Sequence, residues 1–196
     1  YQRTNAAVAV AALETLIERG TAIDKDNIKH GLEQTDWPGR FQIVRQQPLV
    51  ILDGAHNPAA AGELVVSLKA FLPMRPHPAV LVIGTSDDKD IDGMVDILIP
   101  EFDEIVVTRA RHPRSMEIER LSVVFESRGK VVHRTESVSD AITLGLRLAG
   151  YDGLVCVTGS LFVVGEGLRI LPHIMQFQPL SPEAVNPNLQ TSSNLP

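Results

Sequence analysis

From residue 48 onward, the chain alternates between two patterns of apolar and polar residues. Short continuous apolar runs predict buried strands at 48–52, 79–83, 104–108, 130–134 and 153–157. Segments whose apolar residues recur every three or four positions predict amphipathic helices at 58–71, 91–99, 116–127, 138–149 and 161–171. Because the strands lack an apolar/polar alternation, we expect helices on both faces of a mostly parallel sheet. The pattern therefore predicts a doubly wound α/β domain over residues 48–175.

The segments on either side of this domain have a different character. Asn5 can cap a first helix, and a second helix is predicted from Asp24 or Asp26 to about Thr35. We interpret residues 1–36 as the end of a preceding domain, because a helical pair of this size cannot bury a core of its own, and we expect a fragment of a longer protein. Residues 37–47 are predicted to form a linker, and the Pro-, Asn- and Ser-rich segment 176–196 is predicted to be a disordered tail.

Composition narrows the possible partners and the compartment. The 18 basic and 24 acidic residues give a net charge of −6, which offers no positive surface for nucleic acid. The single cysteine, Cys156, has no partner for a disulfide or for a zinc site of several cysteines, so a reducing, cytoplasmic compartment is expected. No apolar run reaches the roughly 18 residues of a membrane span, so no membrane partner is expected.

The segment Asp53–Pro58, Asp-Gly-Ala-His-Asn-Pro, lies where a predicted strand meets a predicted helix. In doubly wound sheets, functional groups gather beyond the carboxyl ends of the strands. There, Asp53 can accept hydrogen bonds from nucleotide hydroxyls, and His56 can bind a carboxylate, a phosphate or a metal. The alternative interpretation is that Asp53 and Asn57 cap the helix and that His56 is an exposed loop residue.

Two further segments carry groups that suit anions. Arg40 follows the turn-forming residues 37–39 and can clamp a phosphate across a gap between domains, or it is a surface arginine beside a packed tryptophan. Ser160 opens the last predicted helix, where its hydroxyl and nearby amides can receive an anion, or it is a simple helix cap. Its surroundings do not fit the Gly-x-Ser-x-Gly pattern of a hydrolase nucleophile.

For other segments with polar side chains, the sequence favours no specific binding or catalytic role. Gly84–Asp90 lacks the Gly-x-x-x-x-Gly-Lys-Ser/Thr order of a phosphate loop and holds three acids, so we interpret it as a loop with a helix cap. Arg111–Ser115 adds positive charge near the strand ends. An ordinary exposed loop explains this segment equally well. The remaining histidines are scattered without the spacing of metal ligands, and we assign no metal ligand in the chain.

The order of these motifs resembles the folylpolyglutamate synthase/dihydrofolate synthase branch of the Mur ligase superfamily. The resemblance covers residues 1–172 and rests on Gln-x-x-Asn-Ala at 2–6, Trp-Pro-Gly-Arg at 37–40, Asp-Gly-Ala-His-Asn-Pro at 53–58, Asp-Lys-Asp at 88–90 and Gly-Ser-Leu-Phe at 159–162. It implies a central ATP-binding domain that ends within 1–36. It also implies a Rossmann-like carboxyl-terminal domain that closes over the nucleotide and brings in glutamate.

The resemblance implies ATP-dependent amide formation, with Mg²⁺ serving the phosphates. A carboxylate of tetrahydrofolate or another folate, or of dihydropteroate, would be activated as an acyl phosphate, and the amine of L-glutamate would then displace phosphate. By position, Asn5, Arg40 and Asp53 match the family's ATP-binding residues, whereas His56 and Ser160 match residues that bind glutamate. Arg40 and His56 also match catalytic residues, and we expect a monomer.

The sequence departs from the family's pattern in two places. Tyr1 stands where the family usually has histidine, and no Gly-x-x-x-x-Gly-Lys-Ser/Thr loop occurs in the chain. The resemblance thus implies that the phosphate cradle and most magnesium ligands lie upstream, and that this chain alone has little activity. Two alternatives stay open, another Mur-type amino-acid ligase and a non-catalytic Rossmann-type module that binds a nucleotide or an amino acid. A binding module has no need of an arginine such as Arg40 in its linker.

Overall fold

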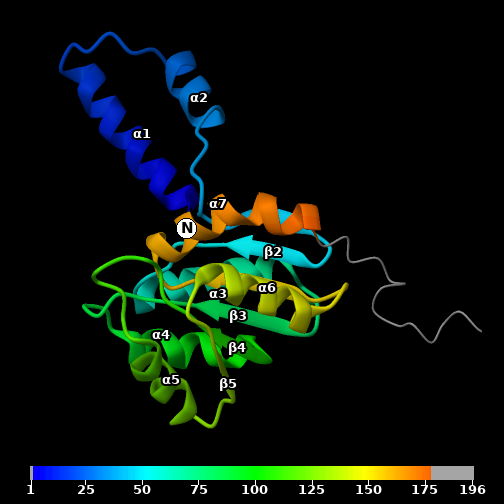
Figure 1. Ribbon diagram of the computed structural model, residues 1–196. Helices are drawn as coiled ribbons and strands as arrows, with labels where there is room; N and C mark the ends of the chain where they lie inside the picture. The colour runs from blue at the N-terminus through cyan, green and yellow to red at the C-terminus, as the bar shows by residue number, and fades with distance from the viewer. Residues whose placement is uncertain (1, 178–196) are drawn as a thin grey trace, which may run out of the picture. The chain divides into compact units, whose positions relative to one another are not determined.

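The computed structural model describes residues 2–177 (Figure 1). Two compact units divide the chain, Tyr1–Pro38 and Gly39–Pro196. Most of the segment predicted to be a disordered tail, residues 178–196, lies outside the described residues. Within 2–177, no helix combines the length and the apolar character that a membrane crossing requires.

The first unit is the predicted pair of helices, α1 (Gln2–Glu18) and α2 (Lys25–Glu33). A capping box begins α2, since the Asp24 carboxylate accepts the Asn27 N–H at 2.7 Å and the Asn27 side-chain oxygen accepts the Asp24 N–H at 3.1 Å. The predicted cap of α1 is wrong. Asn5 lies inside the helix, because the residues before it are already helical and a cap needs an extended backbone.

The second unit is built on a six-stranded sheet in the order β1-β2-β6-β3-β4-β5. The strands are β1 (Gln42–Gln46), β2 (Leu49–Leu52), β3 (Ala79–Ile83), β4 (Glu104–Val107), β5 (Val132–Arg134) and β6 (Leu154–Thr158). All pairings from β2 to β5 are parallel. The predicted mostly parallel α/β fold is therefore confirmed, and the carboxyl ends of β2, β6, β3 and β4 meet at one edge.

Strand β1 was not predicted, because it falls within the segment 37–47 that the sequence pattern presents as a linker. It pairs antiparallel with β2 at the edge of the sheet, with a register shift between Ile43 and Arg45. An edge strand has one strand neighbour, and the residues of β1 are only partly buried or exposed. Its sequence, Gln-Ile-Val-Arg-Gln, therefore lacks the continuous apolar run that marks the inner strands.

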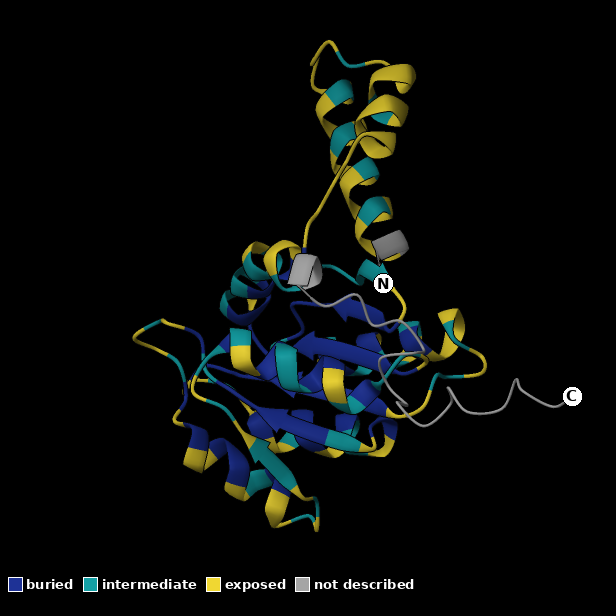
Figure 2. Cartoon of the chain, turned by 45° about the vertical axis from the view of Figure 1, so that its right-hand side comes forward, coloured by how far each residue is buried: buried dark blue, intermediate teal, exposed yellow. Residues whose placement is uncertain are grey.

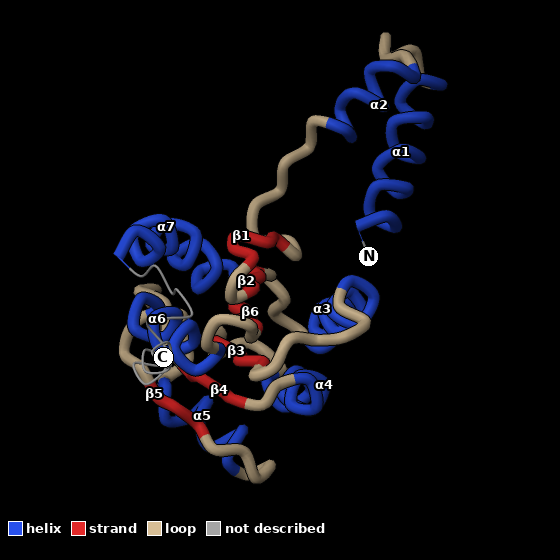
Figure 3. The backbone as a smooth tube through the Cα atoms, turned by 90° about the vertical axis from the view of Figure 1, so that its right-hand side faces the viewer, coloured by secondary structure: helices blue, strands red, loops and turns tan. Residues whose placement is uncertain are grey.

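Helices cover both faces of the sheet. On one face lie α3 (Pro58–Phe71), α4 (Ile91–Leu98) and α5 (Ile118–Glu126), which pack with Ile51, Leu81 and Cys156. On the other lie α6 (Val138–Ala149) and α7 (Leu161–Phe177), which pack with Val80 and Val155. Figure 3 shows the strands between these two layers, and Figure 2 shows the inner strands fully buried. Alternate residues of each inner strand thus pack into two separate cores, one on each face of the sheet, which explains why these strands are apolar throughout.

The last helix is longer than its pattern predicts. The expected end at residue 171 precedes Pro172, yet α7 continues through this proline to Phe177. Proline lacks the N–H of an intrahelical bond and crowds the carbonyl four residues before it, which usually ends or bends a helix. Pro172 itself is exposed on α7.

A buried ion pair stabilises the unit away from the strand motifs. The Glu101 carboxylate, only 6% exposed, accepts a hydrogen bond from Arg75 Nη1 at 2.6 Å and lies 2.8 Å from Lys69 Nζ. Burial by itself raises the pKa of Glu101, but the hydrogen bonds and charges of Lys69 and Arg75 outweigh it, so the pKa lies below its ordinary value. The folded state therefore favours the ionised carboxylate.

We expect Glu101 to make the stability of this unit depend on acidity. A carboxyl whose folded pKa is depressed stabilises the fold above its unfolded pKa, and this contribution is lost as pH falls through the folded pKa. The free energy of unfolding should therefore fall below about pH 4.5 more steeply for the natural chain than for Glu101→Gln, whose amide does not titrate. Urea unfolding at pH 7, 5, 4 and 3 measures the difference, and parallel pH curves would contradict the assignment.

Candidate functional site

Asp53 follows β2 directly and is the most buried acid at the carboxyl edge of the sheet, with 2% of its surface exposed. Its Oδ1 accepts the N–H of Ala55 at 2.9 Å, within its own loop. Its Oδ2 accepts the N–H of Phe41 at 2.8 Å, from the segment before β1. Asp53 therefore shapes the loop 53–58 and also ties it to the residue next to Arg40.

The other residues of this loop divide between two roles. Asn57 caps α3, because its side-chain oxygen accepts the Ala60 N–H at 2.8 Å and Pro58 occupies the first turn. The capping interpretation therefore holds for Asn57, whereas Asp53 makes different bonds. His56 is half-buried, and its Nδ1 lies 2.8 Å from the Gly54 carbonyl oxygen. Since a carbonyl only accepts, Nδ1 carries the hydrogen of this bond, and a neutral ring offers Nε2 as an acceptor.

The turn between β6 and α7 lies against this loop. Gly159 donates its N–H to the Ala55 carbonyl at 3.0 Å, and the Thr158 hydroxyl lies 3.4 Å from the same oxygen. Ser160 is 7% exposed, and its Oγ accepts the Phe162 N–H at 3.1 Å. Ser160 is therefore a cap of α7, and its hydroxyl lies on a turn that is bonded to the loop of Asp53 and His56.

Arg40 lies beside this pair of loops. The Gly39 carbonyl accepts the Gly54 N–H at 2.8 Å, and the Phe41 N–H is bound by Asp53, so both neighbours of Arg40 are tied to the end of β2. Arg40 is half-buried, and within residues 2–177 its guanidinium has no hydrogen bond or ion pair. A permanently charged fork without an acid partner is suited to an anionic ligand.

The structure thus brings together four of the five candidate residues. Arg40, Asp53, His56 and Ser160 all belong to the second unit and lie on segments that bond to one another. Asn5 is an exposed residue of α1, in the first unit.

Sequence reasoning missed the contacts made by the loop after β4. His112 stacks on Phe162, the second residue of α7, with ring centroids 3.6 Å apart, and the Arg114 guanidinium carbon lies 5.7 Å from the same ring. The buried hydroxyls of Thr85 and Thr108, at the ends of β3 and β4, have no hydrogen-bond partner within the described residues. The sequence indicates only that this loop follows a strand. The contact of His112 with Phe162 joins two distant elements, so no local pattern predicts it.

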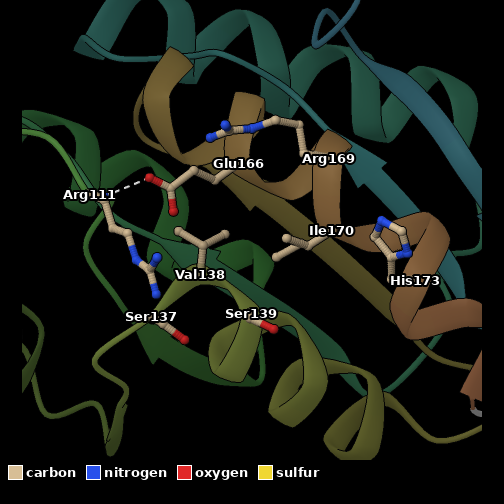
Figure 4. A pocket seen from close by; sticks show the side chains of 8 residues that line it. All are labelled: Arg111, Ser137, Val138, Ser139, Glu166, Arg169, Ile170 and His173. Carbon is tan, nitrogen blue, oxygen red and sulfur yellow. Dashed lines mark hydrogen bonds between the residues drawn. The ribbon is translucent and has the colours of Figure 1, made fainter.

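A cavity of about 550 Å³ lies elsewhere, between α6 and α7. Figure 4 shows Val138 and Ile170 among the side chains that line it and Arg111 extending toward Ser137, while Glu166 accepts the Arg111 N–H at 2.6 Å. None of the five candidate residues lines this cavity. The candidate site therefore rests on the bonded loops at the strand ends.

Two further observations concern possible metal ligands and the single cysteine. Across 2–177, no group of three or more His, Cys, Asp or Glu side chains is placed to hold a metal ion. Cys156 is fully buried, and its pKa is raised first by burial and then by the charge of Asp53. Because the thiolate is the nucleophilic form, Cys156 is an inert core residue.

Comparisons with known proteins bear on the same part of the chain. Residues 39–161 match the family described as Mur ligase, glutamate ligase domain. A Haloferax volcanii protein named probable bifunctional folylpolyglutamate synthase/dihydropteroate synthase is 38% identical over 167 residues, which are 85% of this chain and 19% of that protein.

Two solved structures are also similar. Escherichia coli FolC in complex with DHPP and ADP has a TM-score of 0.75 and 32% identity, over 86% of this chain and 39% of that one. The Yersinia pestis bifunctional folylpolyglutamate synthase/dihydrofolate synthase with AMPPNP and Mn has a TM-score of 0.69 and 30% identity, over 82% and 38%. The chain thus spans about a fifth to two fifths of the length of these relatives. The family match begins at Gly39, where the second unit also begins, and it includes both loops of the candidate site, so this chain belongs to the Mur ligase family.

Proposed function

We propose that this chain is the glutamate-binding part of an ATP-dependent amide ligase, which joins L-glutamate to a folate, to dihydropteroate, or to both. The observation that carries the proposal is that Arg40, Asp53, His56 and Ser160 lie on segments that hydrogen-bond to one another at the carboxyl edge of the sheet, in a chain of this family. Ligands of open α/β sheets bind at this edge. The names of the similar proteins supply the substrate class.

ATP would activate the acceptor carboxylate as an acyl phosphate, and the amine of L-glutamate would displace phosphate to form the amide. The role of this chain is to bind, orient and neutralise charge. Arg40 would offset the negative charge of the transferring phosphoryl group, where a fixed cation has a large effect on rate. Asp53 accepts the N–H of Phe41, the residue after Arg40, and would serve the ATP site, as would Asn5 of the first unit.

His56 and Ser160 would hold L-glutamate. A half-buried imidazole and a hydroxyl at a helix N-terminus are both suited to a carboxylate, and fixing it near the acyl carbon favours reaction through orientation. The phosphate loop and most of the Mg²⁺ ligands would belong to another part of the intact protein. We further propose that the ligase works as a cytoplasmic monomer.

Replacing His56 by alanine in the intact protein should raise the KM for L-glutamate about tenfold or more, because a hydrogen bond to a charged group is worth about 1.5–3 kcal/mol. The KM for ATP should stay within about twofold. His173→Ala, an exposed histidine of α7, is the matched control and should change neither constant. An unchanged KM for glutamate together with an unchanged kcat would remove His56 from the site.

The function is tested by incubating the intact protein with ATP, Mg²⁺ and labelled L-glutamate, with dihydropteroate and tetrahydrofolate in parallel. Incorporation of glutamate into either acceptor, with one ADP released per amide formed, supports the proposal and identifies the acceptor. Binding of ATP or glutamate without any amide product would favour a non-catalytic module. Incorporation into a cell-wall precursor peptide alone would point to another Mur-type ligase.

A further inference from the structure

The backbone on both sides of Arg40 is held by hydrogen bonds. Asp53 Oδ2 accepts the Phe41 N–H at 2.8 Å, and the Gly54 N–H reaches the Gly39 carbonyl at 2.8 Å. The Gly39 N–H in turn donates to the side-chain oxygen of Gln42 at 2.8 Å. A residue in a linker with this many backbone bonds has a defined orientation relative to the sheet.

The conformation of this turn also requires support. Gly39 has a φ of +75°, and a Cβ there would lie 2.6 Å from Val164 Cγ1. Phe41 has a φ of +44°, a left-handed conformation that is strained for a non-glycine residue and persists only when its surroundings enforce it. Among those surroundings are the Asp53 carboxylate, which binds the Phe41 N–H, and the edge-to-face contact of Phe41 with Phe71 at 5.7 Å.

We propose that Asp53 is a positioning residue for Arg40. Its carboxylate holds the Phe41 amide in the strained turn, and the turn aims the neighbouring guanidinium. The inference rests on the proposed function only for the reaction that Arg40 serves. If Asp53 positions Arg40, the loss caused by changing Asp53 is transmitted through Arg40. If Asp53 instead contacts a nucleotide directly, its loss is independent of Arg40.

The chemistry of the carboxylate explains why aspartate is required here. Its two oxygens accept two different backbone N–H groups, of Ala55 and Phe41. Asparagine offers one acceptor and one NH₂ donor, so in Asp53→Asn an NH₂ group must face one of these amides. Since the Ala55 bond closes the loop within two residues, we expect the amide oxygen to stay with Ala55 and the Phe41 tie to be lost.

A double-mutant cycle on kcat/KM for ATP in the intact protein tests the proposal. We expect Asp53→Asn to lower kcat/KM about tenfold or more, and the double variant with Arg40→Ala to be no slower than Arg40→Ala alone, within about threefold. If Asp53 acts on the nucleotide independently, the two losses multiply, and that result overturns the proposal.

A second measurement does not need catalysis. Hydrogen–deuterium exchange of a peptide covering 39–46 should show a protected Phe41 amide in the natural protein and in Arg40→Ala, and faster exchange in Asp53→Asn. Equal protection in all three would overturn the proposal. If the intact protein makes no amide product while this pattern of exchange is found, the proposed function fails and the tie between Asp53 and the Arg40 turn stands.

Discussion

Replacing Arg40 by alanine in the intact protein is expected to lower kcat about a thousandfold, with little change in stability. The Arg40 side chain is half-buried and makes no hydrogen bond or ion pair within residues 2–177, so its removal costs the fold only packing of its aliphatic part. The backbone on both sides of Arg40 is bonded to Asp53 and Gly54, at the strand ends where a transferring phosphoryl group would need a cation. Steady-state kinetics and thermal unfolding on the same preparations measure the two effects separately.

Two further variants make this result specific. Arg40→Lys keeps the charge but loses the planar fork, so we expect it to recover only part of the lost rate. Arg147→Ala removes an exposed arginine near the end of α6 and is the matched control for the loss of one positive charge. Equal turnover in the natural protein and in Arg40→Ala would remove Arg40 from the mechanism.

Gly159→Ala is expected to cause the largest loss of stability among changes at the site, at least about 2 kcal/mol. Gly159 has a φ of +98°, which disfavours any side chain. A Cβ there would also lie 2.6 Å from the Gly84 carbonyl oxygen and 2.8 Å from Ile83 Cγ1. The first of these contacts is with backbone, so relief would require β3 and the start of α7 to move apart.

The matched control for this change is Gly165→Ala, in the same chain segment. Gly165 lies within α7, has no atom within 4 Å of an added Cβ, and should gain about 0.5–1 kcal/mol from the replacement. Urea unfolding of both variants gives the comparison. Similar unfolding midpoints for the two would contradict the close approach of Gly159 to β3.

Most of the fold could be predicted from local pattern. The inner strands are continuous apolar runs because both of their faces are buried, and the pattern places four of them within a residue or two of their observed bounds. The helices that cover them carry the matching three- and four-residue period. Strand β1 escaped prediction because an edge strand with partly polar residues has no such signature, and α7 passed through Pro172 where the pattern suggests an end.

Less of the candidate site was predictable. The motif around Asp53 and the turn at Ser160 could be placed at strand ends, and the capping role of Asn57 could be foreseen, because these depend on neighbours within a few residues. The bond from Asp53 to Phe41 joins residues 12 apart, and the contact of Thr158 with Ala55 joins residues 103 apart. No pattern of residue spacing along the chain predicts either contact.

By itself, the sequence determined the α/β layering, the strand ends at which chemistry is displayed and the residues that carry the family's motifs, since periodicity and local capping act over short distances. Only the tertiary structure decided that Asp53 binds the turn beside Arg40 and that His112 stacks on Phe162. The physical reason is that hydrogen bonds and ring contacts between distant segments depend on how the sheet orders its strands. The order β2-β6-β3 brings residues 53–58 and 158–161 side by side.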